Sequence, residues 1–281
     1  MRDIYQEITE TIIAALEAGI TPWHRPWRDG NTGSAIEPHN AATGRPYSGI
    51  NLLVLGIKPY SSLGWLTFKQ ALELGGNVRK GEKGTTVVFW KFEKREQDGV
   101  EKIVPFARAY TVFNVEQCEN LTGIKAPAVP EKPATDIFEL SQRVGCIVRH
   151  GGARAFYSPS ADFVQMPAIQ DFKAQNAYDA TLAHEMTHWT GHENRCKREF
   201  GKRFGDSAYA FEELVAEIGS AFLCARMGIE MAGLQHANYV GHWLSILKAD
   251  KRAIFTAASK AKEAAGFLLA EREELEMSEA A

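Results

Sequence analysis

The residues with the clearest chemical potential form the run His184-Glu185-Met186-Thr187-His188. The residues around this run favour a helix, and two histidines four positions apart lie on one face of a helix. Both imidazole rings can therefore bind one metal ion, and the spacing is typical of zinc. Glu185 follows the first histidine around the helix, so its carboxylate can contact water that the metal activates. The run therefore predicts a Zn²⁺ site in which Glu185 is the general base of a hydrolytic reaction.

A third metal ligand is expected in the helical segment 210–224, which carries carboxylates among small apolar residues. Glu213 and Glu217 lie one helical turn apart in this segment. In zincins with a glutamate ligand, the first carboxylate binds the metal and an acidic residue four positions later hydrogen-bonds a ligand histidine. The spacing favours Glu213 as the ligand and Glu217 as the orienting residue, and the reverse assignment stays open. Glu212 points elsewhere on the helix, and we expect it to be solvated.

Residues after the second histidine offer weaker candidates. A metzincin site needs a third histidine at position 194, which is an asparagine, so the sequence excludes that class. His192 is interpreted as a loop residue, with a contact to substrate or to a transition-state oxygen as the alternative. Tyr209 is a second candidate for that oxygen. The stretch 193–206 fits either a solvated loop or a surface that steers an acidic partner, because it contains Arg195, Lys197, Arg198, Lys202 and Arg203.

The metal-binding segments must be positioned by a mainly helical C-terminal region with a small sheet. The strand expected at 162–166 comes before the first metal-binding helix and ends at Pro167. Zincins commonly have an edge strand there, and we expect an extended peptide substrate to pair with it. The other expected elements are a helix over 136–145, strands near 146–149 and 154–158, and helices from residue 174 onwards.

The N-terminal region is expected to be α+β. Apolar residues recur every three to four positions from Ile4 to Ile20, which predicts an amphipathic helix. Most of residues 22–64 are interpreted as ordered loop. β-branched and aromatic residues predict two strands joined by a turn at Asp98-Gly99. The elements expected after the first helix are helices near 49–55 and over 65–74 and strands over 85–92 and 103–115.

Three prolines in the polar stretch 122–135 mark the best candidate for a linker. The resulting division places an N-terminal domain at 1–125, the proline-rich linker at 126–135 and a C-terminal domain at 136–281. The predicted fold class is therefore α+β with two domains.

Cations and aromatic rings alternate in the N-terminal region. Residues 22–95 contain eleven Lys or Arg against five Asp or Glu, together with nine aromatic residues. Cations can follow the phosphates of single-stranded DNA while its exposed bases stack on rings. The same composition also fits a small domain whose rings form the core and whose charges are solvated. The candidates for DNA contact are Trp23, Arg25, Trp27, Arg45, Arg79, Lys80 and Lys83.

The composition of the 281 residues restricts the class of protein. Hydrophobic residues make up 45% and charged residues 24%, which is typical of a globular protein with a sizeable core. The net charge of −3 argues against an acidic mimic of DNA and against a protein that is basic throughout. Four cysteines without C-x-x-C spacing fit free thiols in a reducing cytoplasm. Neither a secretory signal nor a membrane span is recognisable, so we expect a cytoplasmic protein without a membrane partner.

Several longer phrases resemble the ArdC-type antirestriction proteins of conjugative plasmids, over nearly the whole chain. In the N-terminal region these phrases are Thr21-Pro-Trp-His-Arg-Pro-Trp, Arg45-Pro-Tyr-Ser-Gly-Ile-Asn, Val78-Arg-Lys-Gly-Glu-Lys-Gly and Val112-Phe-Asn-Val-Glu-Gln. In the C-terminal region they are Ala180-Thr-Leu-Ala-His-Glu-Met-Thr-His-Trp-Thr-Gly-His and Phe204-Gly-Asp-Ser-Ala-Tyr-Ala-Phe-Glu-Glu-Leu-Val-Ala-Glu. The resemblance implies a single-stranded-DNA-binding domain joined to a zincin-like metallopeptidase domain. It also implies a role in protecting incoming plasmid DNA from host restriction.

These observations lead to one prediction of function and one alternative. The prediction is an antirestriction protein that binds single-stranded DNA and is a zinc metallopeptidase, with a host restriction protein as the candidate substrate. His184, His188 and Glu213 would hold the zinc, and Glu185 would be the catalytic base. The alternative is a non-enzymatic protein that coats the entering strand and uses the metal only to hold helices together. Glu185 favours the enzyme, because a structural site is normally closed by a fourth protein ligand.

Overall fold

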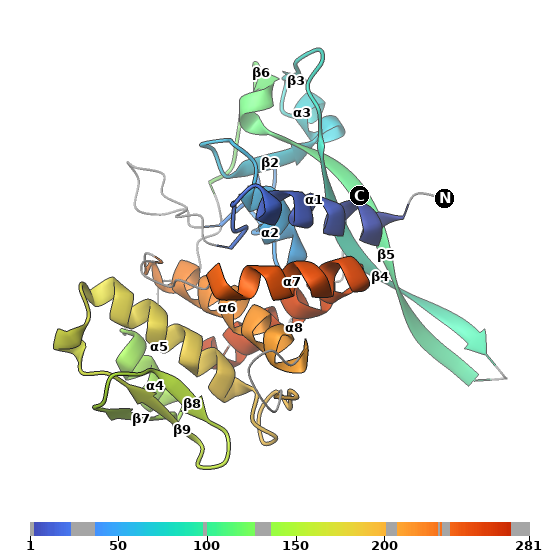
Figure 1. Ribbon diagram of the computed structural model, residues 1–281. Helices are drawn as coiled ribbons and strands as arrows, with labels where there is room; N and C mark the ends of the chain where they lie inside the picture. Colours follow the sequence, from blue (N-terminus) through green and yellow to red (C-terminus); the bar gives the residue numbers. More distant parts are fainter. Residues whose placement is uncertain are drawn as a thin grey trace.

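The computed structural model describes residues 3–23, 37–97, 100–126, 136–200, 207–229, 231 and 237–270. Helices and small sheets occur in both halves of this part of the chain (Figure 1), which confirms the predicted α+β class. The candidates Arg25, Trp27, Lys202 and Arg203 lie outside the described residues, as does most of the expected linker.

A four-stranded sheet organises the N-terminal region. Its order is β1 (His39–Asn40), β2 (Gly64–Thr67), β5 (Val100–Asn114) and β4 (Thr85–Gln97). The last two strands are antiparallel, in register from Thr85 opposite Val112 to Gln97 opposite Val100, which confirms the predicted pair. Figure 1 shows this pair extending well away from the helices. A second, two-stranded sheet pairs β3 (Asn77–Val78) with β6 (Cys118–Glu119), which follows the short 3-10 helix Val115–Gln117.

Two helices cover this region as the sequence predicts. Helix α1 (Ile4–Glu17) begins after Asp3, whose side chain accepts a hydrogen bond from the backbone of Gln6, and it buries one apolar face. Helix α2 (Ile50–Gly56) is joined to β4 through Asn51. The Asn51 amide donates to the carbonyl of Val88 and accepts from its N–H, both at 2.8 Å. These two bonds satisfy the backbone N–H and C=O of Val88, which would otherwise be buried without hydrogen-bond partners.

The prediction of a single helix over residues 65–74 is wrong. Trp65 and Leu66 lie in strand β2, where they are buried between β1 and β5, and helix α3 (Phe68–Glu73) begins only afterwards. Thr67 caps the helix by accepting from the N–H of Gln70, whose side chain accepts from the N–H of Thr67. The apolar residues in this short window fit the periodicity of a helix as well as that of a strand. The pairing of β2 with β5 decides in favour of a strand for Trp65 and Leu66.

The C-terminal region starts with helix α4 (Ile137–Arg143) and a three-stranded sheet, both close to the predicted positions. The strands are β7 (Ile147–His150), β8 (Phe156–Ser158) and β9 (Phe163–Met166), in the order β7-β9-β8. The expectation of an edge strand at 162–166 is wrong, because β9 is paired on both sides and offers no free edge to a peptide. A short 3-10 helix, Ile169–Asp171, leads from this sheet to the helical part.

The described part of the C-terminal region continues with α5 (Gln175–Thr190), α6 (Ser207–Met227), α7 (Ala237–Ala249) and α8 (Ala253–Leu269). Helix α6 lies among the other three and is buried on all sides, with Glu217, Ser220 and Cys224 all 0% exposed. A helix enclosed in this way has no solvated face, so any carboxylate on it needs partners within the protein.

The two regions share an apolar core. One buried cluster combines Ile8, Ile12 and Trp23 from the N-terminal region with Leu214, Ile218 and Trp243 from the helices of the C-terminal region. Figure 1 shows α1 and α2 lying against the helical layer, where α1 contacts α7 and α2 contacts α8. A second buried cluster lies between α5, the three-stranded sheet and the end of α6. The N-terminal region therefore packs directly against the helices of the C-terminal region.

All four cysteines are free thiols, as their spacing predicts. Among the described helices, none combines the length and the apolar character that a bilayer crossing requires.

Candidate metal centre

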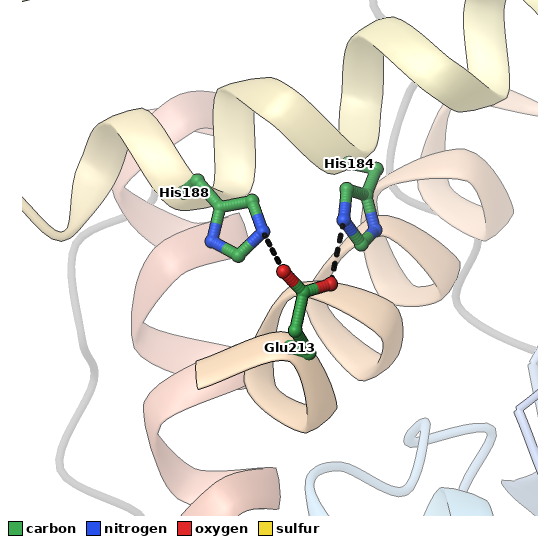
Figure 2. Close-up of side chains that lie close together, drawn as sticks. All are labelled: His184, His188 and Glu213. Carbon is green, nitrogen blue, oxygen red and sulfur yellow. Dashed lines mark ion pairs between the residues drawn. The ribbon is translucent and has the colours of Figure 1, made fainter. Parts of the chain in front are cut away.

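Two helices bring three predicted metal ligands together. Helix α5 presents His184 and His188 one turn apart, and Figure 2 shows the carboxylate of Glu213, from α6, lying between the two rings. The Nε2 atoms of His184 and His188 lie 3.5 Å and 3.6 Å from the carboxylate oxygens of Glu213. Ligand atoms of one tetrahedral zinc ion lie about 3.3 Å apart, from metal–ligand distances of about 2.0–2.1 Å. Only small adjustments would allow all three to bind one ion.

The Nδ1 atom of each histidine faces another carboxylate. His184 Nδ1 faces Glu217 Oε1 at 3.5 Å, and His188 Nδ1 faces Glu212 Oε1 at 3.2 Å. When a histidine donates its Nδ1 proton to a carboxylate, its Nε2 lone pair is directed at the metal. Both rings therefore have the environment of a metal ligand, with Glu213 between their Nε2 atoms. The donor set of two imidazoles and one carboxylate fits a divalent cation such as Zn²⁺.

The expectation that Glu212 is solvated is wrong. Its side chain is 4% exposed and accepts hydrogen bonds from Arg198, whose Nη2 lies 2.8 Å from Glu212 Oε1. Arg198 also donates to the carbonyl of Thr187 and the hydroxyl of Thr190 in α5. The sequence argument assumed a solvated face on this helix, and α6 has none. The available signal was the Glu212-Glu213 pair within an otherwise apolar helix.

The basic residues after α5 are not one solvated surface. Arg198 is 6% exposed and supports Glu212. Arg195 lies with its guanidinium 3.8 Å from the centre of the Trp189 ring and forms an ion pair with Asp162 of the β8–β9 turn. Lys197 is exposed, and His192 is half-buried, with its Nδ1 accepting a bond from the N–H of Asn194. Most of these contacts attach the loop to the domain.

The charges of the cluster support one another. Burial by itself would lower the pKa of His188, but Glu212 and Glu213 outweigh it and raise the pKa from 6.5 to about 10. Burial would raise the pKa of Glu213, but hydrogen bonds from His184 and His188 hold it well below the usual range of a carboxyl. Glu212 behaves in the same way, because His188 and Arg198 outweigh burial and lower its pKa. The carboxylates thus favour the protonated form of His188, and His188 favours their ionised form.

Aromatic side chains line one side of the cluster. Tyr209 is half-buried beside Glu213, and its hydroxyl forms hydrogen bonds with Tyr239 and Glu213. Burial, followed by these contacts, raises the pKa of Tyr209, so the hydroxyl stays protonated and can donate. The Tyr239 ring stacks on Trp243, with centroids 6.1 Å apart. Glu185, adjacent to His184 on α5, is 8% exposed.

Some of the residues predicted to contact DNA are exposed in the structure, and one is buried. Trp23 is 1% exposed and donates from its indole Nε1 to Glu217, so its role as a stacking platform is wrong. Arg45 is exposed beside β1, while Arg79, Lys80 and Lys83 are exposed on the turn between β3 and β4. In that turn, Arg79 forms an ion pair with Glu82 at 2.8 Å. Several other rings of the stretch are buried as well, including Tyr47 and Trp65.

Comparisons with known protein families match both regions. Residues 135–260 match the zincin-like metallopeptidase family, and residues 2–113 match the N-terminal domain of the anti-restriction factor ArdC. The chain therefore combines an ArdC-type N-terminal region with a zincin-like region that carries the histidine cluster.

Solved structures and full-length relatives agree with these matches. The metal-free structure of the antirestriction protein ArdC from the R388 plasmid is 41% identical, with a TM-score of 0.78 over 96% of this chain and 98% of that one. Its Mn(II)-bound structure is 40% identical, with a TM-score of 0.79 over 98% of this chain and 100% of that one. The chain belongs to the ArdC family of antirestriction proteins.

Two further relatives differ in length. The uncharacterised protein y4eC of Sinorhizobium fredii (strain NBRC 101917 / NGR234) is 40% identical over 99% of this chain and 95% of its own length. The DNA primase TraC of Escherichia coli is 36% identical over 96% of this chain, but the match covers only 27% of the primase. An ArdC-like unit therefore also occurs within a much longer protein.

Proposed function

We propose that this protein protects incoming DNA from host restriction, binds single-stranded DNA and is a zinc-dependent peptidase of the cytoplasm. One observation carries the enzymatic part of the proposal: His184, His188 and Glu213 present their ligand atoms within 4.8 Å of one another. Glu185 follows directly on the same helix. These four residues supply a metal site and a base, which is the equipment of a hydrolytic zincin.

The chemistry assigns a role to each side chain. A bound divalent cation supplies a Lewis acid that acidifies water and polarises a carbonyl group. Glu185 accepts the proton of the attacking water and delivers it to the leaving amine of the peptide. The Tyr209 hydroxyl lies beside Glu213 and is placed to donate to an oxygen that gains negative charge. Zinc is proposed because two imidazoles and one carboxylate leave a fourth position open.

Substitution of Glu185 by Gln tests the enzymatic part. The variant keeps all three metal ligands, so zinc content should equal that of wild type while proteolysis of host restriction subunits falls by at least about 10²–10⁴-fold. Glu193→Gln, an exposed glutamate of the following loop, is the matched control. The assay uses the full chain with and without single-stranded DNA. Equal proteolysis by Glu185→Gln and wild type would exclude Glu185 as the base.

Transfer of DNA into a restricting host distinguishes proteolysis from coating of the strand. If protection depends on cleavage, Glu185→Gln should fail to protect while it binds DNA normally. If protection depends on coating, that variant should protect as well as wild type. Expression of both proteins at matched levels makes the comparison decisive, and full protection by Glu185→Gln would favour the non-enzymatic alternative.

The exposed turn between β3 and β4 supports the DNA-binding part. Arg79, Lys80 and Lys83 project three cations from one short segment. Phosphates neutralised by such cations release counterions, so added salt should weaken binding steeply. The double variant Lys80→Ala/Lys83→Ala should bind single strands more weakly and with a shallower salt dependence than wild type. Lys173→Ala, an exposed lysine of the C-terminal region, should have no effect. Preference for duplex over single strands would contradict the proposal.

A further inference from the structure

A tryptophan of the N-terminal region reaches the carboxylate behind a metal ligand. Trp23 is 1% exposed, and its indole Nε1 lies 3.3 Å from Oε2 of Glu217. The other oxygen of Glu217 faces Nδ1 of His184 at 3.5 Å. A continuous series of polar contacts therefore runs from Trp23 through Glu217 to the ring whose Nε2 faces Glu213.

Glu217 depends on these partners because it has no access to water. It is 0% exposed, and a buried carboxylate is costly unless donors satisfy both of its oxygens. The indole of Trp23 donates to one oxygen, and the ring of His184 lies 3.5 Å from the other. Without the indole, the Glu217 side chain would lose this donor and could rotate away. That rotation would loosen the orientation of His184.

The indole is itself held in place by packing. The Trp23 ring meets the Trp243 ring edge to face, with centroids 5.4 Å apart and planes at 70°. Trp243 is also buried, but its own Nε1 donates to the carbonyl of Ala210, one turn before Glu213 in α6. The two tryptophans thus share one environment and differ in the acceptor of their indole N–H. Of the two, only the Trp23 N–H reaches the carboxylate that faces His184.

We propose that Trp23 is a positioning residue of the metal site, through which the N-terminal region sets the orientation of Glu217 and His184 and hence the affinity for metal. The inference rests on the proposed function, because it requires the cluster to bind a divalent metal. The C-terminal region supplies every ligand, but the site is completed by a side chain from the other end of the chain.

Zinc affinity of the full-length protein tests the proposal directly. Trp23→Phe keeps an aromatic ring and removes the indole N–H. We expect zinc to bind about 10-fold more weakly, which is the lower end of the range for loss of a group that orients a metal ligand. Trp65→Phe, in strand β2, removes an indole of equal burial and should leave the affinity unchanged, whatever its effect on thermal stability. A competing chromophoric chelator reports the affinity. The absorption spectrum of the cobalt(II) form should change in Trp23→Phe alone.

A double-mutant cycle shows whether Trp23 acts through Glu217. In a Glu217→Gln background, Trp23→Phe should cause little further loss, because both changes remove the same interaction. Equal loss of affinity in the two tryptophan variants would overturn the proposal, and so would additive losses in the cycle. If wild type bound no zinc, the proposed function would fail first and the inference with it. If wild type bound zinc and Trp23→Phe bound it equally well, only the inference would fail.

Discussion

The two candidate ligand histidines, His184 and His188, face different carboxylates on the side away from Glu213. His184 faces Glu217, which is completed by an indole from the N-terminal region, whereas His188 faces Glu212, which is completed by Arg198. Each ring therefore faces its own carboxylate, and each carboxylate accepts a hydrogen bond from a different side chain, Trp23 or Arg198. Single substitutions can loosen one ligand without removing it, and their effects on metal binding should be separable.

Replacement of Glu212 by Gln should weaken zinc binding about 10–100-fold, because the carboxylate that orients His188 is lost. The fold should also lose stability, since Arg198 would remain buried beside a neutral partner. Zinc titration with a competing chelator measures the first effect, and thermal unfolding without metal measures the second. Glu199→Gln, an exposed glutamate adjacent to Arg198, is the control. Unchanged affinity in Glu212→Gln would show that His188 needs no support from this carboxylate.

The affinity for metal should rise with pH. The pKa of His188 is raised from 6.5 to about 10 in the metal-free fold. Its proton therefore stabilises that fold fully below about pH 6.5, and the contribution is lost as the pH rises through about 10. A metal ion must displace this proton, so the apparent affinity should increase by up to ~10-fold per pH unit within this window.

Calorimetric titration in two buffers with different ionisation enthalpies counts the released protons. Release of a proton per zinc ion at neutral pH is the expected result. An affinity that stays constant while the pH is raised across the neutral range would contradict a protonated His188 in the metal-free protein.

At the scale of the helices, α6 lies close against α5 at Gly219. A Cβ atom at this position would lie 2.5 Å from Thr187 Cγ2, which is closer than any van der Waals contact allows. Thr187 is 0% exposed, and its hydroxyl donates to the carbonyl of Ala183, so it has little room to move. The missing side chain at Gly219 therefore lets the helix with the histidines approach the helix with Glu213.

Gly219→Ala should destabilise the protein by roughly 1–3 kcal/mol, the usual effect of inserting a methyl group into a filled core. It should also weaken zinc binding, because the two helices that carry the ligands are forced apart. Gly241→Ala is the matched control, since this glycine also lies within a helix but has nothing within 4 Å of the added Cβ. That control should gain roughly 0.5–1 kcal/mol from helix propensity. Equal denaturation midpoints and zinc affinities for both variants would contradict the argument.

At the scale of the whole molecule, the shared core predicts that the two regions unfold together. Separation would expose Ile8, Ile12 and Trp23 on one side and Leu214, Ile218 and Trp243 on the other, and all of these are buried. Burial of each large apolar side chain contributes about 1.5–3 kcal/mol. The full chain should therefore show one cooperative transition that is the same by far-UV circular dichroism and by tryptophan fluorescence.

Fragments provide a second check on the shared core. Residues 1–126 and 136–281 expressed separately should each lose the cooperative transition and bind a dye specific for exposed apolar surface. Two separated transitions in the full chain, or a well-folded N-terminal fragment, would show that the regions are independent domains.

The sequence alone determined those features that depend on one continuous segment. The spacing of His184 and His188 within a single helix implies a shared face, whatever the rest of the fold does. The apolar periodicity of α1 and the β-branched and aromatic run of β4 are local signals of the same kind, whereas the predicted turn at residues 98–99 lies outside the described residues. The family resemblance rested on phrases that are continuous in the chain. These parts of the fold and of the candidate site were predictable, because near neighbours in the chain are necessarily near in space.

The tertiary structure decided burial, strand order and long-range contacts, because these depend on which segments pack around one another. Glu212 is buried because α6 is surrounded by three helices, and β9 is central because β7 and β8 flank it. Trp65 lies in a strand because β5 pairs with it. The contact between Trp23 and Glu217 joins residues 194 positions apart, and local patterning carries no information about such pairs. The sequence therefore predicted the candidate ligands that the fold brings together, and only the folded chain showed the residues that pack behind them.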